Sequence, residues 1–447
     1  MTASNGNIPK IPVLSGSSGG ASKSQPPPKA DIGSRRHGDT LTPMDLNLRA
    51  NLTDAEASFL TDFRRDLHMH PELAWEEHRT AAKVAEAARE TGLEVRVGVA
   101  GTGVVAVLRG SGATPRDGVR RTILIRADMD ALPLQETLGR PYGSTVPGKM
   151  HACGHDAHTA MAITAAKVLA RHRDTLPGNV VFAFQPAEET DGGAAPMIAA
   201  GALLEPRVDA AIAIHVANTI QVGQIAAQPG PVSAATDGFV IVIRGKGGHA
   251  ARPHLSVDPI AVAGQMITAL HTLMTREKSP AQPGVLTIGA IHGGTAGNII
   301  ADTCELRGTL RTYDPALRTD LRRRVVEVVE GTAHTFRATA SLEWDGGAYP
   351  PCVNDEAITA LVRDVAGTVV GPSNVVTHEP SLGGDDMAYF LEAVPGCYMR
   401  LGSANAARGI DGPGHSPRFD IDEDCLPIGV NVLVQTAQSY LAGPSDN

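Results

Sequence analysis

From about Asp54 onward, short apolar runs of strand character alternate with longer stretches that place apolar residues on one helical face. Pro71 and Gly92 end the first two helical stretches. Strands that alternate with helices in this way predict an α/β fold built on a sheet. The predicted helices are Ala57–His70, His78–Thr91 and Ala157–His172, and the predicted strands are Val104–Leu108, Thr122–Ala127, Asn179–Gln185 and Ala210–His215.

The pattern changes near Ser233, where the order of elements becomes β-α-β-β-α-β. This order is that of the split βαβ module, a small ferredoxin-like unit. After Gly346 the chain returns to α/β character. We therefore expect an insert, residues 233–346, that divides one domain into residues 51–232 and 347–447. Its predicted strands are Phe239–Arg244, Gly284–His292, Thr303–Thr312 and Ala338–Trp344, and its predicted helices are Asp258–Arg276 and Pro315–Phe336.

Residues 1–50 show almost none of this periodicity. They are rich in Ser, Gly, Pro and Lys, as in Ser15–Gly20 and Pro26–Pro28. Such a segment has too little apolar surface to bury to offset the entropy of folding. We expect a disordered tail.

The composition is that of a globular protein without basic character. The 447 residues are 42% hydrophobic and 19% charged, with a formal net charge of −9. A chain of this length predicts about two to three domains. The negative charge argues against nucleic acid or an anionic membrane as partner. Apolar runs such as Phe239–Ile243 are far too short to span a membrane.

The five cysteines are scattered and odd in number, which argues against a disulfide framework. The first residues show no basic stretch followed by an apolar core, as a secretory signal would. These features predict a reducing, cytoplasmic compartment, in which at least one cysteine is free for other chemistry.

The densest group of reactive side chains lies in Met150–His158, which holds three histidines, Cys153 and Asp156. A thiolate and imidazoles together suit zinc or another borderline-soft divalent metal. A thiol beside an imidazole also suits a nucleophile, Cys153, with His155 as its base. Both interpretations are open on this stretch alone.

Further polar residues follow the predicted strands, where the active sites of α/β sheets lie. Asp128 and Asp130 follow one strand, the adjacent Glu188 and Glu189 follow another, and His215 ends a third. Neighbouring carboxylates repel each other unless a cation lies beside them. With His415 from a Gly/Pro-rich loop, they complete a mixed N/O/S ligand field, which favours the metal interpretation.

The insert has a polar set of its own. His249 lies in a glycine-rich loop after a strand, Asn298 in a second loop, and Arg311 near the end of a strand. Donor-rich groups of this kind suit an oxyanion or a carboxylate. Their spacing alone leaves these roles ambiguous.

These residues together resemble the M20 metallopeptidase family, and within it the amidohydrolases similar to hippurate hydrolase and indole-acetyl-amino-acid hydrolase. The resemblance implies a two-metal α/β catalytic domain with a mixed sheet, interrupted by a ferredoxin-like dimerisation domain. The matching segments run in family order and are Leu67–Leu73, Arg126–Pro133, Met150–His158, Phe184–Glu189, Ile214–His215, Gly245–Pro253, Gly293–Asp302 and Gly414–Phe419.

The resemblance also implies a role for each matching residue. Glu188 matches the general base and acid, and Asp130 the acid that supports the metal centre. His249 matches the histidine that reaches the partner subunit's active site. Asn298 and Arg311 match positions that contact the carboxylate end of the substrate. The residues that match metal ligands are Cys153, His155, Glu189, His215 and His415.

Two departures from the family pattern bear on the substrate. Many M20 peptidases have His where this chain has Asp128, and a bridging Asp where it has Cys153, which favours the amidohydrolase branch. That branch often has Glu-Asp-Phe after paired glycines, whereas this chain has Asp385-Asp386-Met387. A shorter acid and a missing aromatic ring change the expected acyl pocket.

The expected reaction is hydrolysis of the amide bond of a small N-acyl amino acid, such as an N-acetyl or N-benzoyl conjugate. The expected cofactors are two divalent ions per subunit, zinc or manganese, with cobalt and nickel also compatible. The expected assembly is a homodimer. A dipeptidase or carboxypeptidase with the same metal site is the alternative, and a thiol hydrolase using Cys153 is a third reading.

Overall fold

The computed structural model describes residues 52–115, 117–345 and 348–443. The expected tail, residues 1–50, lies outside these ranges. A mixed eight-stranded sheet forms the centre of the α/β part, in the order β1-β2-β4-β3-β5-β16-β6-β15. Its strands are β1 (Glu94–Val99), β2 (Gly103–Arg109), β3 (Thr122–Asp128), β4 (Asn179–Gln185), β5 (Ala210–Gln221), β6 (Ile225–Ala226), β15 (Val375–Val376) and β16 (Gly396–Ala404).

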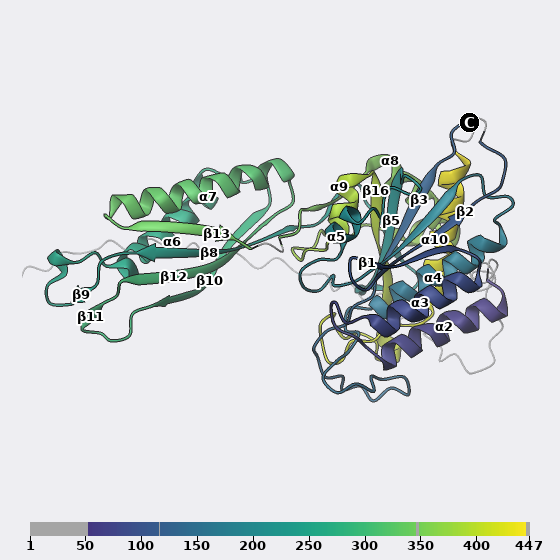
Figure 1. The fold of residues 1–447 in the computed structure, drawn as a ribbon, viewed down its shortest axis with the longest axis horizontal. Helices are drawn as coiled ribbons and strands as arrows, with labels where there is room; N and C mark the ends of the chain where they lie inside the picture. Colours follow the sequence, from purple (N-terminus) through teal and green to yellow (C-terminus); the bar gives the residue numbers. More distant parts are fainter. Residues whose placement is uncertain (1–51, 116, 346–347, 444–447) are drawn as a thin grey trace, which may run out of the picture. The chain divides into compact units, whose positions relative to one another are not determined.

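Helices cover both faces of this sheet because its strands are apolar on both sides (Figure 1). Along β2, alternate residues enter different cores: Val104 and Ala106 pack on one face, Val105 and Val107 on the other. The larger core lies under α2 (Asp54–Met69), α3 (His78–Glu90), α4 (His155–Arg171), α8 (Glu356–Val370) and α10 (Cys425–Ala442). The smaller one lies under α5 (Ala194–Ala199) and α9 (Met387–Ala393).

A second sheet has its own core and two helices. It is antiparallel, in the order β10-β12-β8-β13, which is the order of the ferredoxin-like module that the sequence predicts. Asp258 and Asp314 cap its two helices, and each is followed by a proline that favours a helix start. Its elements are β8 (Ala235–Arg244), α6 (Pro259–Arg276), β10 (Gly284–Gly293), β12 (Thr303–Thr312), α7 (Pro315–Thr335) and β13 (Thr339–Trp344).

Short elements complete the described chain. Strands β9 and β11 pair with each other, as do β7 and β14. Their bounds are β7 (Gly230–Ser233), β9 (Gly248–His249), β11 (Ile299–Ile300) and β14 (Cys352–Asn354), and the 3-10 turns are η1 (Pro253–Leu255), η2 (Pro372–Asn374) and η3 (Ala406–Arg408).

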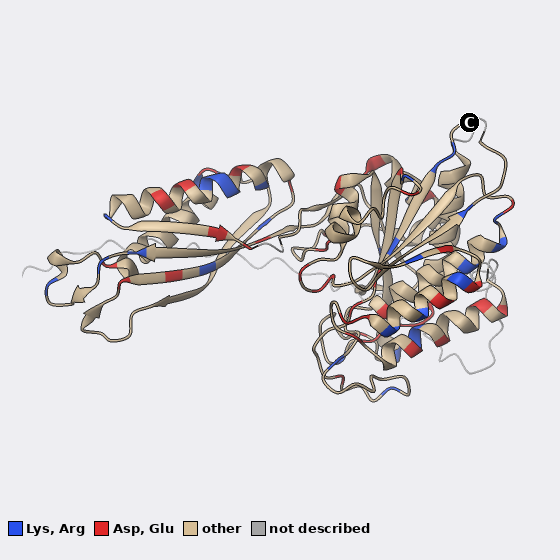
Figure 2. Cartoon of the chain, viewed as in Figure 1, with Lys and Arg blue, Asp and Glu red and all other residues tan. Residues whose placement is uncertain are grey.

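Positions of both charge signs occur along α7, where Figure 2 shows blue and red segments on the same helix. On that helix, Arg323 pairs with Asp320 and Glu327, so its arginines do not form a basic surface. Among the helices in the described ranges, none has the length and apolar character needed to cross a bilayer.

Candidate functional site

The site lies where neighbouring parallel strands end. Strand β3 ends at Asp128 and β4 at Gln185, and the two run parallel. His215 comes from β5, which is parallel to β3. The expectation that His215 ends this strand is wrong, because β5 continues to Gln221. Helix α4 begins at His155, two residues earlier than the sequence pattern predicts. The carboxyl ends of parallel strands meet at one edge of a sheet, so the polar residues that follow them converge there.

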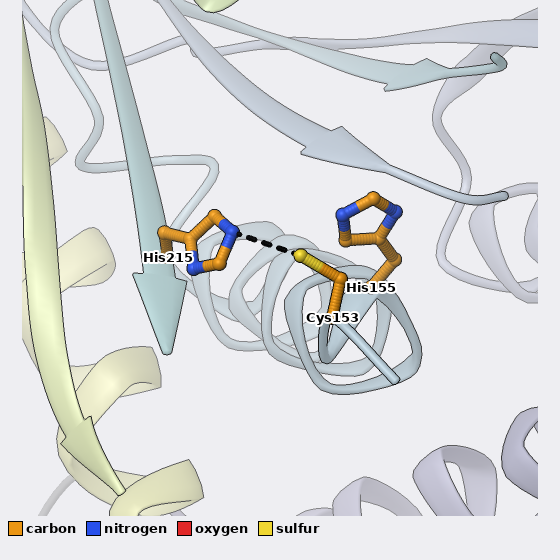
Figure 3. A group of neighbouring side chains, drawn as sticks. All are labelled: Cys153, His155 and His215. Carbon is orange, nitrogen blue, oxygen red and sulfur yellow. Dashed lines mark hydrogen bonds between the residues drawn. The ribbon is translucent and has the colours of Figure 1, made fainter. Parts of the chain in front are cut away.

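All five residues expected as metal ligands come together at this edge. Cys153 Sγ lies 3.4 Å from His215 Nε2, and Glu189 Oε1 lies 3.2 Å from His415 Nε2. His155 Nε2 lies 3.8 Å from Glu189 Oε1 and joins the two pairs. Figure 3 shows the Cys153 side chain between the rings of His215 and His155. A divalent ion prefers this mixture of thiolate, imidazole and carboxylate donors.

Hydrogen bonds orient two of the imidazoles toward the cluster. Nδ1 of His155 donates to the backbone carbonyl of Asp130 at 2.9 Å, and Nδ1 of His215 to that of Val216 at 2.6 Å. In each ring this arrangement leaves the Nε2 lone pair free, as in metal-ligating histidines. Nε2 of His155 is buried without a hydrogen-bond partner among the described residues. A buried orphan acceptor is costly, and a bound cation would satisfy it.

Asp130 holds the two glutamates in place. Its Oδ1 accepts a hydrogen bond from the backbone N–H of Glu188 and its Oδ2 one from Glu189, at 3.1 and 3.0 Å. The preceding Ala187 has φ of 55°, which is uncommon for a residue with a Cβ. Its N–H donates to the buried Glu77 carboxylate at 2.9 Å, and this contact stabilises the turn. Asp130 therefore positions both glutamates.

Asp128 belongs to a network of buried charged and polar side chains next to the ligand cluster. It accepts from His158 Nδ1 and from Arg126, both at 2.6 Å. His158 Nε2 in turn accepts the N–H of Val216, beside the cluster. Arg126 also reaches Asp386 at 2.8 Å. Sequence reasoning assigned no role to Arg126, because its partners lie far along the chain and become neighbours only in the folded sheet.

The Glu188 carboxylate is almost fully buried and lies among other acids. Burial, and then the carboxylates of Asp385 and Glu189, raise the pKa of Glu188 well above its usual range. Asp385 accepts a hydrogen bond from the Tyr398 hydroxyl. A buried carboxyl with a raised pKa suits proton transfer at neutral pH. Met387, expected near the acyl pocket, instead packs in the smaller core.

The thiol of Cys153 is poorly suited to act as a nucleophile. Burial, and then the Glu189 carboxylate, raise its pKa, whereas reactive cysteines have lowered pKa values. Its Sγ lies 3.4 Å from Nε2 of His215. Burial, and then Arg400, lower the pKa of His215 well below its usual range. A thiolate–imidazolium pair between Cys153 and His215 is therefore disfavoured.

A cavity of about 500 Å³ opens onto the cluster. Arg311 lines it, as the sequence suggests for a substrate contact, whereas His249 and Asn298 are not among its lining residues. Those two lie together and exposed beside the β9–β11 pair, where the N–H of Ala250 donates to the Asn298 carbonyl. The lining residues are Cys153, Glu188, Glu189, Thr190, His215, Thr236, Arg311, Tyr349, Ser381, Gly383, Gly384, Asp385, Arg400 and His415.

A buried arginine fixes the start of α4, which carries His155. Arg64 is fully buried and bonds Asp156 at 2.8 Å. His68 bonds the same carboxylate at 2.8 Å. Burial opposes ionisation of Asp156, but Arg64 and His68 hold the pKa of this carboxyl well below its usual range. This network therefore helps to hold the start of α4, and with it His155, in position.

Replacing Arg64 by Met should lower the free energy of unfolding by about 3–5 kcal/mol, because it removes the guanidinium that compensates the buried Asp156 and leaves His68 as the remaining partner of this carboxylate. Arg65→Met is the matched control. Arg65 is 42% exposed, and its ion pair within the described ranges is with Glu423, so its loss should cost about 0–1 kcal/mol. Urea unfolding measures the free energy of unfolding of both variants. Equal losses in the two would show that Arg64 does not stabilise the fold by compensating a buried charge.

Comparison with known proteins places the chain in a family. Residues 124–439 match the model of peptidase family M20/M25/M40. N-acetyl-L-cysteine deacetylase of Bacillus subtilis (strain 168) is 40% identical over 403 residues, covering 90% of this chain and 93% of that protein. Thermostable carboxypeptidase 1 of Saccharolobus solfataricus is 38% identical over 391 residues, covering 86% and 96%.

A solved structure agrees with this relationship. The crystal structure of a dinuclear metal-binding peptidase of the M20 family from Bacillus subtilis matches with a TM-score of 0.74 and 35% identity, covering 87% of this chain and 99% of that one. The family and the mixed-sheet α/β fold expected from the sequence are thus confirmed. The chain belongs to peptidase family M20 and is a hydrolase of amide or peptide bonds.

Proposed function

We propose that this protein is a metal-dependent amidohydrolase that cleaves N-acyl amino acids into an acid and an amino acid. The observation that carries the proposal is the cluster itself, in which His155 and four further donor residues lie together next to the buried Glu188, and Nε2 of His155 has no hydrogen-bond partner among the described residues. The similarity to a deacetylase of an N-acetyl amino acid supports this substrate class.

We propose two divalent ions per subunit. Divalent ions held here would supply Lewis-acid activation of water and of the amide carbonyl. The thiolate and imidazole donors favour zinc, and the carboxylates also admit manganese, cobalt or nickel. The proposed ligands are Cys153, His155, Glu189, His215 and His415.

Glu188 is the proposed general base and acid. Its carboxylate accepts a proton from the attacking water, and its carboxyl then donates that proton to the nitrogen of the leaving amine. Asp130 keeps Glu188 in position through the backbone contact described above. The raised pKa of Glu188 makes its carboxylate a stronger base toward the attacking water and keeps the carboxyl protonated until the proton is passed on.

The insert has a proposed role in completing the site. We propose domain bounds of 51–232, 233–346 and 347–447, with the middle part forming a homodimer interface. His249 would then stabilise the oxyanion in the partner's site, with Asn298 and Arg311 binding the substrate carboxylate. The exposure of His249 and Asn298 is consistent with contacts made in the partner. A cytoplasmic location accords with the five free cysteines.

A substrate panel tests the proposed function. The protein should hydrolyse N-acetyl and N-benzoyl amino acids with a kcat/KM at least about tenfold higher than its kcat/KM for free dipeptides. This ratio corresponds to a difference of roughly 1.4 kcal/mol in transition-state stabilisation between the two substrate classes. Amine release from metal-loaded protein provides the measurement. The second candidate is a carboxypeptidase or dipeptidase, which one relative's name favours. A preference for peptides would replace the proposal with that candidate.

A further inference from the structure

Arg400 is a cation at the active-site edge of the sheet for which the described residues provide no ion-pair partner. It lies on β16 and lines the cavity together with Cys153 and His215. Within residues 52–115, 117–345 and 348–443, its guanidinium makes no hydrogen bond and no ion pair. Arg126, on the neighbouring part of the site, instead bonds both Asp128 and Asp386. The charge of Arg400 is therefore available to a ligand.

The guanidinium is held in place by its surroundings. Its Cζ lies 4.8 Å from the centroid of the Tyr398 ring, a distance at which an arginine stacks on an aromatic face. Tyr398 is buried and its hydroxyl donates to Asp385, so the ring cannot easily move. A stacked guanidinium keeps its edge N–H donors free for a planar anion. Asp385 contributes negative charge nearby but forms no ion pair with Arg400 within 4.0 Å.

The main cavity that Arg400 lines is polar. Its lining contains no Leu, Ile, Val, Met or Phe side chain. A large apolar acyl group would gain little by entering this cavity, because the hydrophobic gain depends on burial against apolar walls. An adjoining cavity of about 290 Å³, which Arg400 also lines, is mixed and includes Val216 and Phe419 beside Asn218 and His378.

Two arginines line the main cavity, Arg311 and Arg400. Under the proposed function, the α-carboxylate of an N-acyl amino acid needs one of them, Arg311. We propose that Arg400 binds a second carboxylate of the substrate, so that the enzyme selects dianionic N-acyl amino acids. This inference rests on the proposed function. The second carboxylate belongs either to the acyl group or to the side chain of the amino acid, and the chemistry recognised is the same.

A structural role for Arg400 makes a different prediction. If its charge only balances the thiolate and carboxylates of the cluster, its loss affects all substrates alike. If it binds a carboxylate, its loss affects only substrates that carry one, mainly through KM. The ratio between two substrates that differ in a single charge separates these cases.

The test uses two matched pairs of substrates with the metal-loaded protein. One pair is N-succinyl-alanine and N-succinamoyl-alanine, in which the distal carboxylate is an amide. The other is N-acetyl-glutamate and N-acetyl-glutamine. The variants are Arg400→Met, Arg400→Lys as the conservative change, and Arg65→Met, which removes the same charge from the exposed face of α2.

We expect the wild type to prefer the anionic member of one pair by about tenfold to a hundredfold in kcat/KM, as for a charge-assisted hydrogen-bonded pair. Arg400→Met should abolish this preference, Arg400→Lys should keep part of it, and Arg65→Met should keep all of it. The pair that shows the effect identifies which end carries the carboxylate. No preference in either pair, or one that survives Arg400→Met, would overturn the inference.

Calorimetry separates this inference from the proposed function. Succinate should bind the wild type about tenfold or more tightly than succinamate if the acyl side is recognised, and glutamate more tightly than glutamine if the other side is. Arg400→Met should remove the difference. These measurements need no turnover, so they hold even if no N-acyl amino acid is hydrolysed. Equal binding of both members of both pairs would refute the role of Arg400.

Discussion

The Glu188→Gln variant should lose about 10²- to 10⁴-fold of the wild-type kcat, the range expected for removing a general acid–base group. Glutamine fills the same space but neither accepts the proton of the attacking water nor returns it to the leaving amine. The fold should persist, since the backbone contact of Glu188 to Asp130 does not involve its side chain. Steady-state hydrolysis of an N-acetyl amino acid measures the effect.

The neighbouring Glu189 offers the matched control. Glu189→Gln is the same chemical change one residue away, at a position proposed to hold metal. Elemental analysis should find the full metal content in Glu188→Gln and a reduced content in Glu189→Gln. A Glu188→Gln variant with wild-type kcat, or with its metal lost, would show that Glu188 is not the proton-transfer group.

Exhaustive chelation should remove activity to below about one part in 10³ of the wild-type rate, because Glu188 without a cation beside it neither lowers the pKa of the attacking water nor polarises the amide carbonyl. It should also lower the unfolding midpoint. A metal present at about 1,000 times its dissociation constant adds about 4 kcal/mol to stability. Without it, the buried acids Glu188, Asp385 and Asp386 stay close together with reduced compensation.

The thiol-hydrolase alternative predicts the opposite result. A nucleophilic Cys153 would work without metal, so activity would survive chelation and disappear on alkylation of the thiol. If the site works through metal ions, the chelated protein is inactive whether or not its thiol is alkylated. The chelated, unalkylated protein then regains its activity when a divalent ion is returned. Activity that persists after chelation would reverse the assignment of Cys153.

Strands β2, β3 and β4 and the main helices and strands of the insert follow from local sequence, because apolar periodicity and turn residues act over a few positions. Thr303–Thr312, for example, is a strand with the bounds that the pattern predicts. Helix α4 starts at His155 rather than Ala157, an error typical of helix ends. The grouping of the five ligands came from the resemblance to the M20 family, because the spacing of the residues alone did not assign them to one site.

Strand β16 was not predicted, although it pairs with β5 in the middle of the sheet. Its position results from pairing with a segment far away in the sequence, which no local pattern encodes. The same reason hid the partners of Arg126 and the free guanidinium of Arg400. Whether an arginine is paired depends on which strands become neighbours, so its role appears only in the folded chain.

The central claim is that this family M20 hydrolase uses two divalent ions per chain. The most direct measurement titrates metal-free protein with zinc or manganese and follows hydrolysis of an N-acetyl amino acid. We predict that activity rises until about two equivalents of metal per chain are bound and then levels off, in line with a two-metal site. Full activity in the metal-free protein, or a plateau after about one equivalent of metal per chain, would contradict a two-metal site.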